Sequence, residues 1–473
     1  MEETQKNEGA DASKTELFEK APIPKAVMKL AIPTILSSLV MVIYSMADTY
    51  FVGLLNDAVQ TAAVALAAPV LLAFNAVNNL FGVGTSSMMS RAMGKKDFGT
   101  MERCCAVGFY LALFSGLFVS LVYTAFHTPI LNLLGAESDT VSATGRYLMW
   151  TTSLGAAPAI MNVVMAYLVR SEGAALHASI GTMSGCVLNI ILDPVFIMPW
   201  GLDMGAAGAG CATFISNCTA CAYFLILIAA KRKKSHVCID PRKFRPKKDL
   251  VFGICGVGIP AAIQNLLNVT GMIILDNFMS SYGADAVAAM GIVQKVNMIP
   301  LYIALGLGQG IMPLIGYNYS SGNVDRMKKA VRFALIADEI FLVAITIVYH
   351  VFSEGLVSFF IDEETVIAYG SAFLKGMCLA IPFYALDFLA VGIFQACGMG
   401  KKSLIFALLR KVVLEIPALI VLNILFPMYG LAYAQPFAEF VMAILAAVVL
   451  LRMFSKLDRN MNKEEKPEVQ RGN

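Results

Sequence analysis

The chain has 473 residues; 58% of them are hydrophobic and 15% are charged, and the mean hydropathy is +0.69. Soluble domains keep about a quarter of their residues charged, so this composition excludes a soluble protein and indicates a polytopic membrane protein. The net charge of +3 says little about partners, and we expect no nucleic acid among them.

The polar N-terminal end lacks the features of a signal peptide. Residues 1–20 hold six acidic residues and three lysines but no apolar segment. Such a composition is typical of a disordered, solvated tail. We therefore expect a disordered cytoplasmic tail over residues 1–24 and a second polar tail over residues 455–473.

Hydropathy and helix-breaking residues predict twelve membrane-spanning helices, so the expected fold class is an all-α polytopic membrane protein. Several spans exceed the minimum length of about 20 residues, which indicates tilt. The first six spans run approximately over 26–54, 60–91, 103–126, 141–169, 175–199 and 205–230. The last six run approximately over 250–281, 286–317, 330–352, 365–396, 402–426 and 429–453.

Lysine and arginine residues lie on one side of this topology. The connections after spans 2, 4, 6, 8 and 10 are all basic, whereas those after spans 1, 5, 7 and 11 contain neither residue. Cytoplasmic loops carry an excess of these residues, so both termini are expected in the cytoplasm. The loop between spans 6 and 7 carries nine of them and is expected to touch anionic lipid; a regulatory site is the alternative.

The two halves of the chain repeat. Pro33 corresponds to Pro260 and Pro194 to Pro417, with offsets of 227 and 223 residues. Six spans per half make a parallel repeat, which is typical of secondary transporters. No G-x-x-x-x-G-K-[ST] pattern is present, so an ion gradient or a separate partner must drive transport. The expected divisions are a six-helix lobe over 25–231, a basic linker over 232–248 and a second six-helix lobe over 249–454.

Four polar residues are predicted at similar membrane depth in the first lobe. Asp48 lies near the outer end of the first span, and Asp193 near the outer end of the fifth. Asn189 is one turn before Asp193 on the same helix face, and Thr213 lies about 12 Å along the sixth span. Ionisable groups at this depth cost roughly 2.5 kcal/mol or more, and by default they indicate function.

These carboxylate, amide and hydroxyl oxygens suit a hard cation such as sodium. They suit a proton equally well, because burial and a neighbouring like charge favour a protonated carboxyl. Structural roles are the alternatives. Asp48 would then bind loop amides, and Asp193 would satisfy backbone groups freed by Pro194. Asn189 and Thr213 would form only interhelical hydrogen bonds.

The chain shows no other metal or catalytic pattern. Its ten cysteines and four histidines are scattered. Cys218 and Cys221 form a C-x-x-C within an apolar span but lack the further ligands of a zinc site. We therefore expect no cofactor, no metal centre and no catalytic residue, and a coupling ion that is a proton or sodium.

Five segments resemble the multidrug and toxin extrusion (MATE) family over nearly all of residues 25–455. They are ADTYFVG at 47–53, SRAMGKKD at 90–97, YLVRSEG at 167–173, LNIILDPVFI at 188–197 and GAAGAGCAT at 205–213. The resemblance is greatest to a bacterial, MepA-like branch. It implies two pseudo-symmetric six-helix lobes, a V-shaped cleft, and export of cationic or amphipathic drugs in exchange for protons or sodium.

The same resemblance bears on individual residues. In several MATE transporters, the residues that match Asp48, Asn189, Asp193 and Thr213 form a cation site in the first lobe. Many members also carry a glutamate in span 7 that contributes to a second-lobe site. This chain has Gln264 and Asn265 in that region, which argues against a second site of that type.

Substrate-binding candidates lie on spans expected to face the cleft. Methionines provide an adaptable apolar surface, although ordinary packing is the alternative for any one of them. Lys295 and Asp387 either pair across the cleft, or Asp387 binds a cationic drug. Lys411 and Glu415, spaced i,i+4, are expected to neutralise one another. The full set of substrate candidates is Met161, Met165, Gln264, Met290, Lys295, Met298 and Asp387.

Together these features predict a secondary active multidrug exporter of the bacterial plasma membrane that works by alternating access. Its expected partners are small-molecule drugs and membrane lipid, and we expect a monomer. The alternative transporter is a flippase for a lipid-linked saccharide, but such proteins often have fourteen spans and a strongly basic cavity. A membrane-embedded enzyme is disfavoured because no nucleophile–base constellation is present.

Overall fold

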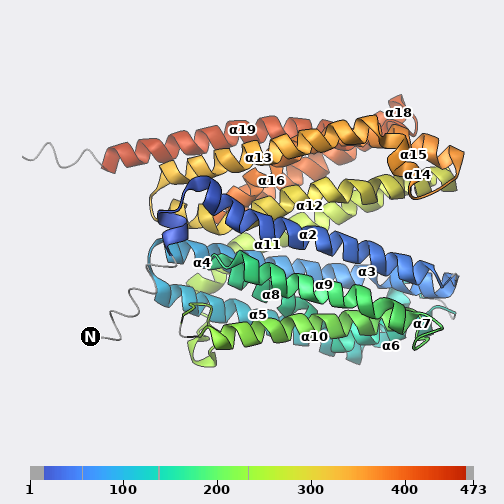
Figure 1. Cartoon of the computed structure of the whole chain (residues 1–473), viewed down its shortest axis with the longest axis horizontal. Coiled ribbons are helices and arrows are strands. Elements are labelled where there is room, and N and C mark those ends of the chain that lie inside the picture. Colours follow the sequence, from blue (N-terminus) through green and yellow to red (C-terminus); the bar gives the residue numbers. More distant parts are fainter. Residues whose placement is uncertain (1–14, 56, 137–138, 233, 465–473) are drawn as a thin grey trace, which may run out of the picture.

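The structure, a computed structural model, describes residues 15–55, 57–136, 139–232 and 234–464. It is an elongated bundle of helices, and no strand occurs in these residues (Figure 1). Both described chain ends lie at the same end of the bundle, which we call the terminal end; the opposite end is the far end. The even number of predicted spans requires this arrangement.

The first lobe extends to residue 230. It contains α2 (Ile23–Gly53), α3 (Ala58–Asn78), the π-helical segment η1 (Asn79–Val83), α4 (Gly84–Gly94), α5 (Phe98–Ala125), α6 (His127–Leu133), α7 (Val141–Leu148), the π-helical segment η2 (Met149–Leu154), α8 (Ala156–Ser171), α9 (Ala175–Ile197) and α10 (Ala206–Ala230).

The linker and the second lobe follow. They contain the 3₁₀ turn η3 (Pro241–Lys243), α11 (Lys248–Ser280), α12 (Ala284–Ser320), α13 (Val324–Val351), α14 (Ser353–Ser358), α15 (Glu364–Met377), the 3₁₀ turn η4 (Cys378–Ala380), α16 (Ile381–Ala396), α17 (Gly400–Leu408), the π-helical segment η5 (Leu409–Glu415), α18 (Ile416–Leu425) and α19 (Leu431–Glu464).

Each predicted span coincides with one helix or with consecutive helical segments. Within the described residues, nine helices are long and apolar enough to cross a membrane, and Val141–Leu154 with Ala156–Ser171, bent by 50°, forms a tenth. The other two predicted spans correspond to α13 and to α17, η5 and α18 together. The latter carries Arg410, Lys411 and Glu415 at its centre, which reduces its apolar character. The expected all-α polytopic fold is confirmed.

Polar side chains fix where three of these helices begin. Asp57 Oδ1 accepts from Val59 N at 2.8 Å ahead of α3, and Asp97 Oδ1 accepts from Thr100 N at 2.9 Å ahead of α5. Asn323 caps α13 in the same way. Each cap satisfies a backbone amide that has no partner inside the first helical turn. The caps therefore separate long apolar segments that would otherwise run together.

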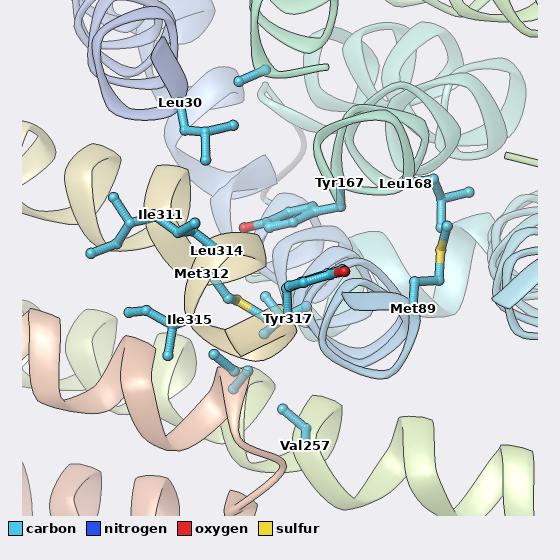
Figure 2. Close-up of a cluster of buried hydrophobic side chains, with 14 of the residues drawn as sticks. Leu30, Met89, Tyr167, Leu168, Val257, Ile311, Met312, Leu314, Ile315 and Tyr317 are labelled. Atoms are coloured by element: carbon cyan, nitrogen blue, oxygen red, sulfur yellow. The ribbon is translucent and has the colours of Figure 1, made fainter. Parts of the chain in front are cut away.

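The packing of the lobes differs between the two ends of the bundle. One apolar core includes residues of both lobes, among them Leu30, Tyr167, Val257, Ile311 and Tyr317 (Figure 2). Two smaller cores lie toward the far end, one built by residues 279–434 and the other by residues 52–209. The lobes thus share a core near the terminal end and have separate cores near the far end.

Glycines allow the lobes to approach closely where they share that core. A Cβ at Gly306 of α12 would lie 2.9 Å from Ile35 Cα of α2, and a Cβ at Gly310 would lie 2.9 Å from Ala31 Cα. These two contacts belong to a crossing of α12 over α2. At a second crossing between the lobes, Gly258 of α11 lies against the Leu80 carbonyl of η1. These contacts leave no room for a larger side chain, so the two crossings fix the relative position of the lobes in this state.

The expected disorder of residues 1–24 is wrong for residues 15–24, while residues 1–14 lie outside the described part. Residues 15–19 form a helical turn, and α2 already begins at Ile23. The side chain of Phe18 is fully buried. Tertiary packing explains the difference, because this one aromatic side chain of a polar segment packs into a pocket formed by both lobes.

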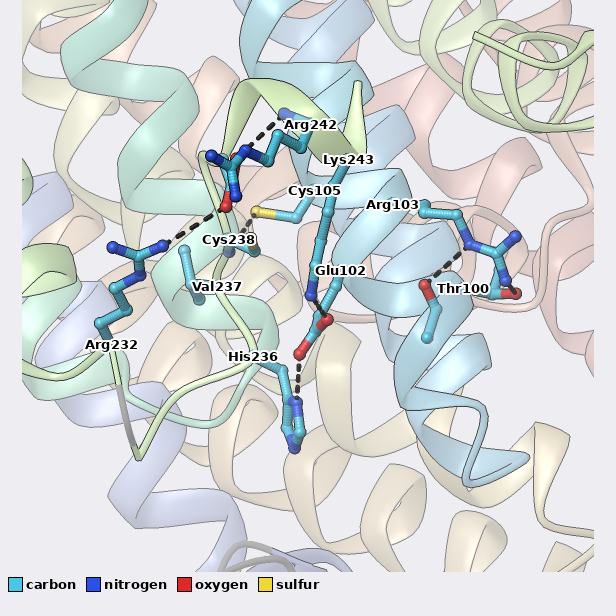
Figure 3. A network of polar contacts seen from close by, with 12 residues as sticks. Thr100, Glu102, Arg103, Cys105, Arg232, His236, Val237, Cys238, Arg242 and Lys243 are labelled. Carbon is cyan, nitrogen blue, oxygen red and sulfur yellow. Dashed lines mark hydrogen bonds and ion pairs between the residues drawn. The ribbon is translucent and has the colours of Figure 1, made fainter. Parts of the chain in front are cut away.

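One further boundary differs from the expected one. The helix α19 continues to Glu464 instead of ending near residue 454. At the described positions 235–244, the linker docks on the first lobe (Figure 3). His236 stacks on Phe98 with ring centroids 4.4 Å apart, and Glu102 contacts both His236 and Lys243. These polar partners come from distant positions, so composition alone did not reveal them.

Candidate functional site

The four candidate cation-site residues of the first lobe lie on α2, α9 and α10. Asp193 and Asn189 are 0% and 1% exposed. With the amide oriented so that both of its atoms are satisfied, Asn189 Nδ2 donates to Asp193 Oδ2 at 2.9 Å, and Asn189 Oδ1 accepts from Thr213 N at 3.0 Å. Asn189 therefore links Asp193 to Thr213, as the i,i+4 spacing indicated.

Asp48 completes this group from α2. It lies close enough to Asp193 for the two carboxylates to interact electrostatically. Its Oδ1 atom is buried and has no hydrogen-bond partner within the described residues. An unsatisfied carboxylate oxygen inside a membrane protein is costly. The oxygen is therefore available for a proton or a small cation.

Two tyrosines near these carboxylates were missed from sequence. The Tyr44 side chain lies beside that of Thr213, and both Tyr44 and Tyr147 lie within electrostatic range of Asp48 and Asp193. Tyr44 is one helical turn before Asp48, so its spacing offered a signal. Tyr147 comes from α7, and no local pattern connects it to the site.

A cavity of about 110 Å³ lies between the lobes. The π-helical segment η1 supplies its first-lobe wall, while α11, α12 and α16 supply the second-lobe wall. Such segments often occur at functional sites. Its lining contains no charged residue. The lining residues are Asn79, Val83, Ala261, Gln264, Asn265, Asn268, Leu305, Gly308, Gln309, Met312, Phe388, Val391, Gly392 and Gln395.

Of the seven substrate candidates, only Gln264 lines this cavity. Met161, Met165 and Met290 are packed into the apolar cores, which corrects the expectation that they face the cleft. Met298 is partly buried and does not line the cavity. The sequence pattern of apolar residues on a helix cannot distinguish a methionine in the core from one in the cleft, because both surfaces are apolar.

The ion pairs of the second lobe contradict one expected pairing, Lys295 with Asp387, and confirm another, Lys411 with Glu415. Asp387 Oδ2 accepts from Arg410 Nη1 at 3.3 Å, so Asp387 does not pair with Lys295. Lys295 is exposed and has no ion pair within the described residues. Lys411 Nζ donates to Glu415 Oε1 at 2.7 Å, which confirms that expected neutralisation.

Arg410 also interacts beyond Asp387. Its Nη1 atom lies 3.8 Å from Glu439 Oε1, and its Nη2 atom donates to Asn268 Oδ1 at 2.6 Å. The guanidinium stacks over Phe388 at 4.9 Å from the ring centroid. Asn268 and Phe388 both line the cavity. The charged cluster, which consists of Asp387, Arg410 and Glu439, therefore lies directly behind the residues that line the cavity.

The profile of the MatE family matches residues 33–195 and again residues 260–421. The chain belongs to the MatE family. This membership confirms the resemblance inferred from the five segments, and the twofold match follows the internal repeat. MatE proteins are membrane transporters, so the chain is a multi-pass membrane transporter and not an enzyme.

Similar proteins support the same assignment. The chain is 31% identical over 440 residues to the multidrug export protein MepA of Staphylococcus aureus strain MRSA252, covering 93% of this chain and 96% of that protein. MepA of Staphylococcus saprophyticus is 31% identical over 441 residues, with the same coverage.

Solved structures show the fold that this MatE chain shares. An outward-facing multidrug resistance MATE transporter of the MOP superfamily superimposes with a TM-score of 0.88 at 23% identity, covering 94% of this chain and 98% of that one. A MOP superfamily transporter from Pyrococcus furiosus superimposes with a TM-score of 0.86, also at 23% identity and with the same coverage. The two-lobed fold is therefore that of known transporters.

Proposed function

We propose that this MatE transporter is a secondary active multidrug exporter that exchanges cationic or amphipathic drugs for protons or sodium by alternating access. Small-molecule drugs are its cargo, and the MepA relatives are named as multidrug exporters. The uncharged cavity lining disfavours the alternative cargo, a lipid-linked saccharide, because the multiple negative charges of a pyrophosphate group need cations in direct contact.

The coupling ion binds at Asp48 and Asp193, with Asn189 and Thr213 as supporting oxygen ligands or hydrogen-bond partners. The observation that carries this assignment is the unpartnered, buried Oδ1 of Asp48 beside the fully buried Asp193. Binding of a cation there removes the cost of two adjacent buried carboxylates. A cation shifts the conformational equilibrium only through different affinities for the two states.

The transporter lies in the bacterial plasma membrane as a monomer, in contact with lipid and with both termini in the cytoplasm. Every loop at the terminal end carries Lys or Arg, which supports this orientation. The shared core near the terminal end and the separate cores near the far end then correspond to an outward-facing state. Drug release to the outside accompanies cation entry from that side.

The test is ethidium efflux from proteoliposomes under a proton gradient alone and under a sodium gradient alone. Wild type should respond to one gradient, and Asp48→Asn and Asp193→Asn should each abolish the response. Asp57→Asn is the matched control, because this exposed N-cap keeps a capping side chain after the same change. Efflux by both variants at the wild-type rate would exclude the pair as the coupling site.

A further inference from the structure

The cavity between the lobes is lined by an unusual density of amide groups. Six of its fourteen lining residues are Asn or Gln, and none carries a charge. Complete sites for drug-sized molecules usually enclose about 300–1,000 Å³. At about 110 Å³, this cavity accommodates one end of such a molecule and not the whole of it.

Buried arginines determine which atoms two of these amides offer to the cavity. Arg410 Nη2 donates to Asn268 Oδ1 at 2.6 Å, and Arg170 Nη1 donates to Gln309 Oε1 at 3.4 Å. Each arginine thereby occupies an amide oxygen and leaves the NH₂ group free. Gln264 is similar, because its Oε1 accepts from Gln395 Nε2 at 3.2 Å. Three lining amides therefore remain as hydrogen-bond donors.

The charges of the two arginines are not equally compensated. Arg410 lies beside Asp387 and Glu439. Arg170 is 6% exposed, and no carboxylate contacts it in the described part of the chain. The Cζ atom of Arg170 lies over the Tyr167 ring, 5.3 Å from the ring centroid. A buried cation without a counter-ion attracts negative charge into the adjacent cavity.

One acceptor remains beside these donors. Asn265 Oδ1 is buried and has no hydrogen-bond partner within the described residues. A ligand that fills the cavity with only apolar surface would leave this oxygen and three NH₂ groups unsatisfied. Each unsatisfied buried group costs about 1–3 kcal/mol, so the lining selects against such a ligand.

We infer that this cavity binds a hydrogen-bond-accepting end group of the exported molecule, preferably a carboxylate, through the amides of Asn268, Gln309 and Gln264. The inference rests on the proposed export function and specifies its substrate class. The preferred substrates are zwitterions that carry a carboxylate at one end and a cationic amine at the other. A cation without an acceptor binds the cleft without using the amides.

The experiment compares norfloxacin, a zwitterion, with its methyl ester, which lacks the free carboxylate. Binding to the full-length transporter in lipid nanodiscs is followed by drug fluorescence. Wild type should bind norfloxacin about tenfold tighter than the ester, which corresponds to about 1.4 kcal/mol. Gln309→Glu should remove this preference, because its carboxylate pairs with Arg170 and repels the drug. Gln60→Glu makes the same change outside the cavity, where the oxygen that accepts from Ala206 N is retained, and should leave the preference intact.

Ethidium distinguishes a failure of this inference from a failure of the proposed function. A single cooperative thermal unfolding transition should show that Gln309→Glu is folded, and ethidium binding by wild type should show that a cation binds the cleft without the amides. Equal affinities of wild type for norfloxacin and its ester overturn the inference, as does ethidium binding without norfloxacin binding. Preserved selectivity in Gln309→Glu overturns it too. Loss of gradient-driven ethidium export by wild type would instead contradict the proposed function.

Discussion

Phe18 stacks on Tyr317, with ring centroids 5.2 Å apart and ring planes inclined by 19°. The contact joins the N-terminal segment to α12 of the second lobe. At the tip of the ring, a Cβ at Gly173 of the first lobe would lie only 2.8 Å from Phe18 Cζ. Arg326 Nε donates to the Phe18 carbonyl at 2.5 Å. Phe18 therefore lies in a pocket formed by both lobes.

Replacement of this ring should destabilise the state in which the lobes meet at the terminal end. Phe18→Ala removes a fully buried aromatic side chain and should cost about 3–5 kcal/mol. Thermal unfolding should show a lower Tm, and spin labels at positions 95 and 321 should report longer distances. Phe359→Ala is the matched control, because Phe359 is 84% exposed at the far end. An unchanged distance distribution in Phe18→Ala would show that the ring does not hold the lobes together.

Acid should weaken the same contact through Glu19. The Tyr317 hydroxyl donates to Glu19 Oε1 at 2.5 Å, and with nearby Lys96 it holds the pKa of this carboxyl below its usual range. A depressed pKa contributes stability above the usual value of about 4.3, and this contribution is lost as the pH falls through the folded-state pKa. Proteolysis of residues 15–21 should therefore accelerate below about pH 4. Glu19→Gln should lose this pH dependence, whereas Glu16→Gln should retain it.

The charged cluster behind the cavity should be strongly cooperative. Asp387→Ala leaves Arg410, which is 3% exposed, with the more distant Glu439 as its remaining ion-pair partner within the described residues. Breaking one partner of a buried ion pair typically costs about 3–5 kcal/mol. Thermal unfolding should show that Asp387→Ala with Arg410→Met is less destabilised than the sum of the two single variants. Additive effects would contradict direct coupling of the pair.

The docked linker should depend on one carboxylate. Glu102 contacts both His236 and Lys243, and its hydrogen bond raises the pKa of the Lys243 ammonium (Figure 3). Glu102→Ala should release the linker, so trypsin should cleave after Arg242 and Lys243 faster than in wild type. Asp325→Ala, which removes an exposed partner of Lys329 at 3.5 Å, should not change cleavage. Equal cleavage of wild type and Glu102→Ala would assign docking to the remaining contacts, which are the Phe98–His236 stack and the hydrogen bonds of His236 N and Cys238 N to the first lobe.

The features that could be predicted from the sequence depend on residues within a single helix. Each span predicted from hydropathy coincides with one helix or with consecutive helical segments, and the i,i+4 spacing placed Asn189 beside Asp193, where the structure has them. The amide cavity was not predictable in this way. Asn268 of α11 and Gln309 of α12 are uncharged residues on separate apolar helices, and only the tertiary packing of these helices brings them to one cavity. The partner of Asp387 was missed for the same reason, because its ion pair with Arg410 crosses between spans.

The unequal distribution of the apolar cores has a thermodynamic consequence. If the lobes separate at the terminal end and close at the far end, the shared core around Leu30 and Ile311 is opened to water. Exposure of apolar surface raises the heat capacity by about 0.45 cal/mol/K per Å². Any imbalance between the apolar areas exposed at one end and covered at the other then makes the enthalpy of the transition depend on temperature. The turnover rate of such a transporter should follow a curved Eyring plot, and substitutions in the shared core should change that curvature.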